Sequence, residues 1–240
     1  MRGIGAVVRK ELLVYFNTPV AYIVMIAFLV FTSVWLFVIH DFFAAGLASL
    51  RSYYGIMPVV FVGLIPAVSM RMWSEERLAG TDEILLTLPV SEPVLVLGKY
   101  LAALALVAAT VALTAFVPLT VTRLGDFERG EIVGQYLGLL LLAAAGIGLG
   151  GLVSALSRNQ ISAFLFTALV LLFLTLVSRV NNVLQLPAAL AAFLNYVSLD
   201  YHFRSLNRGV LDTRGLIYFL GIAASSVYLT TSVLVARKLR

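Results

Sequence analysis

The sequence predicts an all-α membrane protein with six transmembrane helices. Of its 240 residues, 61 % are hydrophobic and 12 % are charged, a composition far from that of a water-soluble domain. The mean hydropathy of +1.02 holds for the whole chain, so the apolar excess recurs along the sequence and does not form a single core helix. Uncharged apolar stretches of about 20 residues, the length that crosses a bilayer, occur at 20–39, 52–70, 100–122, 132–157, 159–178 and 215–236.

The composition also excludes several kinds of chemistry. The chain has no cysteine, which excludes disulfides, thiolate metal sites and cysteine nucleophiles. It lacks a G-x-x-x-x-G-K-[ST] phosphate loop, a G-x-S-x-G nucleophile elbow and an H-E-x-x-H zinc motif. None of the six stretches holds the charged residue or histidine that an ion-coupled pump uses. The net charge of +5 comes without the basic run that binds nucleic acid.

We therefore expect no catalytic residue, no metal site and no nucleic-acid partner. The two histidines, His40 and His202, lie in different connecting segments far apart in the sequence. Each is more easily explained as an ordinary interfacial histidine than as a metal ligand.

The first element, residues 1–18, is expected to be an amphipathic helix at the membrane surface. Its apolar residues recur at helical spacing and share one face: Ile4, Val7, Val8, Leu12, Tyr15 and Phe16. The charged residues Arg9, Lys10 and Glu11 are expected to lie off that face, where they form the entry-helix interface. Pro19 separates this helix from the first span, because proline removes a backbone donor and disfavours helix at the preceding residue.

The segment that follows the second span, 71–93, is expected to hold two short helices. Ser74 suits a helix start and Gly80 a helix end, and Thr81 then starts a second helix that Pro89 ends. Ser91, Glu92 and Pro93 begin the third span. The apolar residues of the segment need a partner, either the membrane surface or another protein; the alternative is a solvated connector.

Glycine is concentrated in the fourth span. Two pairs at small-xxx-small spacing, Gly134 with Gly138 and Gly146 with Gly150, permit close approach of neighbouring helices. We expect helix packing here, although a glycine-rich helix could also bend during a conformational cycle.

The segment between the fifth and sixth spans, 181–213, is expected to hold short amphipathic helices in or near the outer leaflet. They would form an external cap, a partner-docking surface or simple loop packing. Six spans place both termini on one side, and ten of the 17 Lys and Arg residues then lie on that side. The excess favours cytoplasmic termini, in a multi-pass protein of the cytoplasmic (inner) membrane.

Several stretches of the chain resemble a known family. They are RKELLVYFNTPVAYIV at the start, MRMWSEERLAGTDEILLTLPVSEPVLVLGKYLA after the second span, the turn SALSRNQISAF, and YVSLDYHFRSLNRGVLDTRGLIYFL before the last span. Together with the order of the elements, they are similar to the permease subunits of type 2 ATP-binding-cassette (ABC) exporters, and most of all to the gliding-motility-associated subfamily. The resemblance covers essentially the whole chain as a single transmembrane permease domain, 1–240.

The resemblance implies a non-catalytic subunit that couples ATP hydrolysis in a partner to export of an unknown substrate. ATP and Mg would bind to a cytoplasmic ATPase dimer, and this chain would bind no cofactor. The ATPase would dock on the entry helix and on a coupling segment made of Trp73, Glu75, Glu76, Arg77, Gly80, Thr81, Asp82 and Glu83, with Arg158 as a smaller contact. Glu75, Glu76 and Arg77 are expected to form polar contacts with the ATPase or with the entry helix, while Trp73 packs.

Further partners follow from the same resemblance. A second permease copy or homologue would complete the pathway within the lipid bilayer, and an auxiliary membrane-anchored protein with an external domain would accompany it. The alternative function is a membrane component that does not transport and instead transmits ATP-driven conformational change to an envelope or motility machine. A secondary transporter working alone would need an intramembrane acid and an internal repeat, and the sequence shows neither.

Overall fold

The computed structural model describes residues 2–39, 50–81, 90–123, 128–184 and 187–238, all of them helical or in short connections. Within these ranges, six helices are long and apolar enough to cross a membrane: Pro19–Ile39, Met57–Leu78, Glu92–Val121, Gly130–Leu156, Gln160–Val180 and Thr213–Lys238. The prediction of an all-α protein with six candidate spans is therefore confirmed.

The first half of the chain contributes three of these spans. The helices are α1 (Arg2–Phe16), α2 (Pro19–Val34) with the π-helical turn η1 (Trp35–Ile39), α4 (Arg51–Gly55), α5 (Met57–Ser69), α6 (Arg71–Leu78), α8 (Glu92–Leu113) and α9 (Phe116–Val121). Pro19 is the first residue of α2, and Thr18 before it has extended backbone, which is the break expected between the entry helix and the first span.

The second half contributes the other three spans. Its helices are α10 (Arg129–Leu156), α11 (Gln160–Leu184), α12 (Ala188–Val197), α13 (Leu199–Asn207) and α14 (Thr213–Lys238). The short helices expected between the fifth and sixth spans are thus present as α12 and α13, although α11 runs on to Leu184, beyond the expected end of the fifth span.

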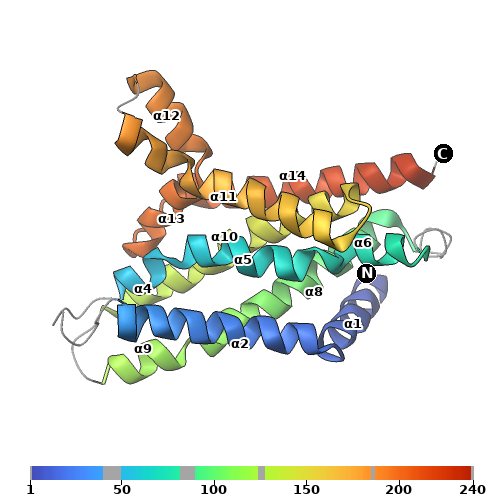
Figure 1. Ribbon diagram of the computed structural model, residues 1–240, viewed down its shortest axis with the longest axis horizontal. Helices are drawn as coiled ribbons and strands as arrows, with labels where there is room; N and C mark the ends of the chain where they lie inside the picture. The colour runs from blue at the N-terminus through green and yellow to red at the C-terminus, as the bar shows by residue number, and fades with distance from the viewer. Residues whose placement is uncertain (1, 40–49, 82–89, 124–127, 185–186, 239–240) are drawn as a thin grey trace.

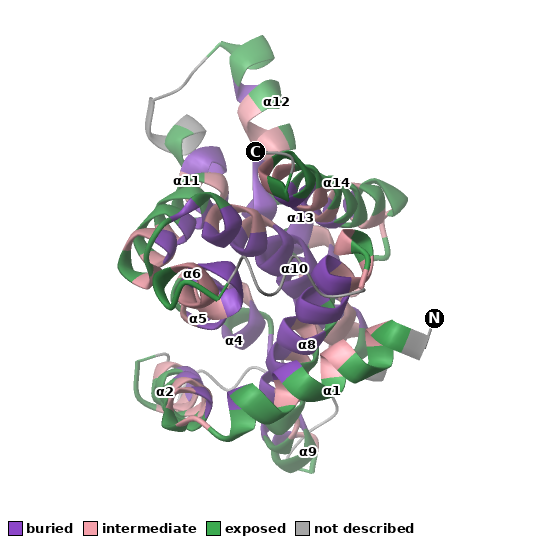
Figure 2. Ribbon diagram, turned by 90° about the vertical axis from the view of Figure 1, so that its right-hand side faces the viewer, coloured by how far each residue is buried: buried purple, intermediate pink, exposed green. Residues whose placement is uncertain are grey.

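Helix α10 forms the centre of the bundle. It packs against α5, α8, α11, α13 and α14, and Figure 2 shows it buried along most of its length. Helix α2 lies at the edge, and α12 projects from one end (Figure 1). Both termini lie at the opposite end, beside α1 and α6 (Figure 1).

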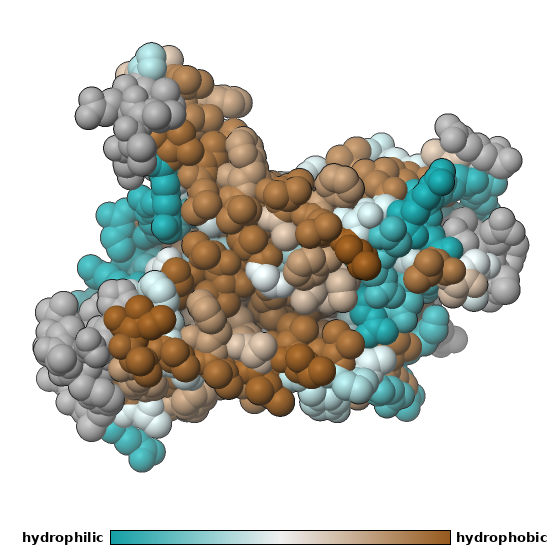
Figure 3. All heavy atoms as spheres, viewed as in Figure 1, coloured by the Kyte–Doolittle hydropathy of each residue, from teal (hydrophilic) through white to brown (hydrophobic). Residues whose placement is uncertain are grey.

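The surface has the banding of a membrane protein. In Figure 3 hydrophobic side chains cover the middle of the molecule, and hydrophilic ones gather towards both ends. The long helices run through this hydrophobic belt, so the bilayer would surround the middle of the bundle.

One sequence-based boundary is wrong, and another span is longer than its uncharged stretch. Helix α6 is not separate from the second span, because Met70 keeps helical backbone angles and joins α5 to α6 directly. The third span begins at Glu92, as Ser91, Glu92 and Pro93 predict, so α8 includes Lys99, which lies before the uncharged stretch 100–122. The expectation that these spans carry no charge therefore fails at their ends on the α1 side. The second short helix expected after Thr81 falls on 82–89, outside the described residues.

Candidate functional site

A group of charged side chains lies at the end of the bundle where both termini lie. We call it the charged cap, and it consists of Glu11, Arg71, Glu75, Glu76, Arg77 and Lys99. These residues come from α1, α6 and α8, three elements that the fold brings together at one end (Figure 1).

Lys99 is the central cation of the charged cap. Its Nζ lies 2.8 Å from Glu76 Oε1 and 3.4 Å from Glu11 Oε1, and the side chain is 3 % exposed. The same Nζ lies 5.2 Å from the centre of the Trp73 ring, which allows a cation–π interaction. One buried ammonium group therefore joins α1, α6 and α8.

Arg71 ties the junction of α5 and α6 to the entry helix. Its guanidinium donates to both carboxylate oxygens of Glu75, at 2.7 and 2.9 Å, and to Thr18 Oγ1 at 3.3 Å. Beside it, the hydroxyl of Tyr15 donates to the carbonyl of Val68 at 3.2 Å. Burial raises the pKa of Tyr15 above its usual value, so this hydroxyl keeps its proton and remains a donor.

Ser154 of α10 fixes the start of α6. Its hydroxyl donates to the Met70 carbonyl at 3.0 Å and accepts from the backbone N–H groups of Trp73, at 3.1 Å, and Ser74, at 3.3 Å. One serine thus contacts the residue where α5 passes into α6. Through it α10 holds the direction of α6.

Arg77 holds the far end of α10. Its Nη1 donates to the carbonyls of Ser157, at 2.6 Å, and Ala155, at 3.3 Å, and Arg237 also donates to the Ala155 carbonyl. The last carbonyls of a helix lack partners within it and carry partial negative charge. Arg77 is therefore bonded to this helix end.

The outer end of α6 is exposed. Gly80 has a φ of +67°, its N–H bonds to the Arg77 carbonyl, and the N–H of Thr81 bonds to the Glu76 carbonyl. This is a Schellman cap, in which glycine adopts the left-handed conformation without a side-chain clash. Leu78, Gly80 and Thr81 are exposed, and so is Arg158 of the turn between α10 and α11, which follows the Ser157 carbonyl bonded to Arg77.

The structure separates the expected coupling residues into two groups. Trp73 is buried, and Glu75, Glu76 and Arg77 are half-buried and already paired within the chain. Gly80, Thr81 and Arg158 are exposed and available to a partner. Asp82 and Glu83 lie outside the described residues.

The entry helix presents a face that differs from the expected one. Arg9 and Lys10 are exposed, as expected, but Glu11 is buried on the packed face, where it meets Lys99. Of the residues expected on the apolar face, Tyr15 is buried and Phe16 is exposed. The packed face runs along α8, where a Cβ atom on Gly98 would lie 2.5 Å from Val7.

The four singled-out glycines lie at close helix contacts. A Cβ atom on Gly134 would lie 2.9 Å from the Gly209 backbone, and one on Gly138 would lie 2.9 Å from Leu206, both next to α13. On the other pair, a Cβ on Gly146 would lie 2.4 Å from Ile65, and one on Gly150 would lie 2.2 Å from Ser69. One pair thus lets α13 approach α10, and the other lets α5 approach.

The opposite end of the bundle carries its own buried polar contacts. Asp200 of α13 pairs with Arg204 and Arg179, and Ser198 bonds to Ser178 of α11. His202 is buried, stacks on Tyr218 and bonds to the Tyr196 carbonyl. No group of three potential metal ligands occurs within the described ranges. His40 lies outside the described residues.

Sequence reasoning missed Lys99 and Ser154. Lys99 stands only seven residues after Glu92 in an otherwise apolar helix, and a lone charge in such a helix signals a buried partner. The sequence gives no comparable signal for Ser154, because placing a serine in a membrane helix costs little free energy at most positions.

No protein-family model matches the chain, and no curated protein matches it. The family resemblance therefore rests on the sequence stretches themselves. Any proposal of function rests on those stretches together with the geometry of the charged cap.

Proposed function

We propose that this chain is the permease subunit of an ABC transporter of the type 2 exporter class. Its charged cap would face the cytoplasm and take up movement from a separate pair of ATPase subunits. The observation that carries the proposal is the arrangement of α6. This helix continues α5 through Met70, is bonded directly to α8 and α10 and through Lys99 to α1, and exposes its far end.

Such an arrangement suits a lever between an ATPase and the spans. A force on Leu78, Gly80 and Thr81 would act on α6, and α6 can move only if α5, α8 or α10 moves or if their bonds to α6 break. Coupling requires that the nucleotide states of the ATPase contact this end with different free energies. The buried charges would transmit that difference, and the exposed end would receive it.

The remaining parts of the proposal follow the same geometry. The cap end holds both termini (Figure 1), so both would be cytoplasmic in the inner membrane. ATP and Mg would belong to the ATPase, while this chain supplies no catalytic group. A second permease copy would complete the pathway, and an auxiliary membrane-anchored protein would meet the other end, near α12 and α13.

The proposed docking of the ATPase is tested by changing only the exposed end of α6 and Arg158. We expect the double variant Leu78→Asp/Arg158→Glu to retain about tenfold less of a co-expressed ABC ATPase than the wild type in pull-downs from detergent, a change of about 1.4 kcal/mol in binding. Both side chains are exposed, so the thermal unfolding midpoint of the variant should match that of the wild type.

The matched control is Arg214→Glu, an exposed charge reversal at the opposite end of the bundle, which should retain the ATPase fully. Equal ATPase retention by the double variant and the wild type would place the docking surface elsewhere. No retention by the wild type would remove the ATPase from the proposal and favour a membrane protein that works alone.

A further inference from the structure

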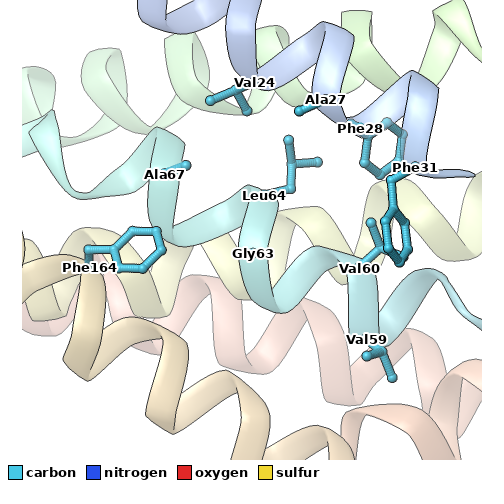
Figure 4. A pocket seen from close by; sticks show the side chains of 10 residues that line it. All are labelled: Val24, Ala27, Phe28, Phe31, Val59, Val60, Gly63, Leu64, Ala67 and Phe164. Atoms are coloured by element: carbon cyan, nitrogen blue, oxygen red, sulfur yellow. The ribbon is translucent and has the colours of Figure 1, made fainter.

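A groove opens on the hydrophobic belt between α2, α5 and α11. It has a volume of about 480 Å³, within the roughly 300–1,000 Å³ typical of ligand pockets. Figure 4 shows the side chains that line it: Val24, Ala27, Phe28, Phe31, Val59, Val60, Gly63, Leu64, Ala67 and Phe164. None of these side chains is polar.

Two contacts lie beside the groove. The Phe28 ring of α2 and the Phe61 ring of α5 meet at 5.9 Å, and Tyr15 of α1 donates to the Val68 carbonyl of α5 at the cap end. The groove is open at Gly63, where a Cβ atom would meet nothing within 4 Å. Water gains no partner in an apolar hollow, and an empty one loses dispersion contacts, so a hydrocarbon ligand is favoured there.

A polar side chain lies beyond the cap end of the groove. A hollow of only about 10 Å³ shares Val24 and Ala67 with the groove and is also lined by Thr18 and Arg71. Three of the five N–H bonds of the Arg71 guanidinium go to Glu75 and Thr18. Among the described residues, no acceptor bonds to the other two N–H groups, and guanidinium groups bind phosphate strongly.

The length of the groove fits one leaflet of a bilayer. From Thr18 to Phe31 the chain advances 13 residues along α2, about 20 Å at about 1.5 Å per residue. One leaflet contributes about 15 Å of the roughly 30 Å hydrocarbon core. A molecule with its phosphate at Arg71 would therefore place its tail along α2 to Phe31.

We propose that this groove binds one acyl chain of a glycerophospholipid from the leaflet at the cap end, with the lipid phosphate at Arg71. A helix of a second copy is about 10–12 Å across with its side chains, too broad to enter a hollow of this volume, whereas a single hydrocarbon chain fits. The site is independent of the ATPase, so it stands or falls separately from the proposed transport function.

The test uses the full chain in nanodiscs that contain phosphatidylglycerol with a photoactivatable diazirine in its acyl chain. After illumination, mass spectrometry should find the label on the α2 and α5 peptides that line the groove. Gly63→Leu places a side chain in the open space, and we expect it to reduce that labelling about tenfold, equivalent to about 1.4 kcal/mol in binding.

The matched control is Gly221→Leu on α14, where a Cβ atom also meets nothing within 4 Å; its groove labelling should equal that of the wild type. Thermal unfolding of both variants shows whether they are folded, and Gly63→Ala repeats the test with a smaller side chain. Equal labelling of Gly63→Leu and wild type, or equal labelling of α14 and the groove, overturns the proposal.

The binding of the lipid phosphate at Arg71 is tested with a diazirine-labelled diacylglycerol, which has the same acyl chains and no phosphate. We expect it to label the groove about tenfold less than phosphatidylglycerol, and Arg71→Gln to reduce that difference. Equal labelling by the two lipids in the wild type overturns the assignment of the phosphate to Arg71. The chain has no cysteine, so a disulfide-linked dimer of Ala27→Cys would show a second copy in the groove instead and overturn the lipid assignment.

Discussion

Helices α10 and α2 are about equally apolar and occupy opposite environments. Their mean hydropathies are 2.2 and 2.6, yet 72 % of the α10 window is buried inside the bundle and 17 % of the α2 window is. The difference lies in glycine, because α10 has six glycines from Gly134 to Gly151 and α2 has none. Neighbouring helices approach α10 at these glycines, so small residues and not hydropathy decide which span becomes the centre.

The same contrast applies to two lysines. Lys99 and Lys10 both lie within 4 Å of the Glu11 carboxylate, at 3.4 and 3.7 Å. The Lys99 side chain is 3 % exposed and the Lys10 side chain 61 %. Distance alone would make the two ion pairs alike, but burial makes one structural and leaves the other solvated.

The largest expected effect on stability comes from substituting these two lysines. Lys99→Met leaves the buried carboxylate of Glu11 and the half-buried carboxylate of Glu76 without their shared cation, and we expect the free energy of unfolding to fall by about 3–5 kcal/mol. Lys10→Met removes an exposed partner and should cost about 0–1 kcal/mol. Denaturant unfolding of both variants in the same detergent measures the difference. Equal losses would show that Lys99 is not the centre of the charged cap.

A smaller effect is expected at the seam between α10 and α5. In Gly150→Leu the new side chain meets Ser69 and Thr167, and overpacking of this kind costs about 1–3 kcal/mol. Gly221→Leu on the open side of α14 adds the same side chain without a neighbour and should leave the thermal midpoint near that of the wild type. If the two variants had the same thermal unfolding midpoint, glycine would not explain the central position of α10.

The smallest effect is expected on the outer face of α2. Ile26 is 60 % exposed, and substitutions away from packed sites usually change stability by less than about 0.5 kcal/mol. Ile26→Ala should therefore unfold at the same denaturant concentration as the wild type in detergent. A loss comparable to that of Gly150→Leu would mean that a partner covers this face in the purified protein.

The spans, the break at Pro19 and the helix start at Glu92 could be predicted because each depends on local composition. Hydrocarbon length and proline geometry act within a few residues of the chain, and a single sequence displays them. The short helices between the fifth and sixth spans followed from the same kind of local pattern.

The inner contacts of the charged cap could not be predicted in the same way. Lys99 meets Glu11, 88 residues earlier, and Glu76, 23 residues earlier, and no local pattern specifies such pairs. The position of Glu11 did have a signal, because it follows Val7 by four residues and precedes Tyr15 by four, on the packed stripe of α1. Because Glu11 is charged, it was expected to lie off the apolar face.

The position of both termini at the same end of the bundle (Figure 1) has a practical consequence for protein engineering. Two copies encoded in one reading frame, joined from Lys238 to the next Arg2 by a flexible Gly/Ser linker, would enter the membrane with the same orientation and need no added span. Such a tandem gene would allow a substitution to be placed in one half alone, which would show how many intact halves an assembly requires.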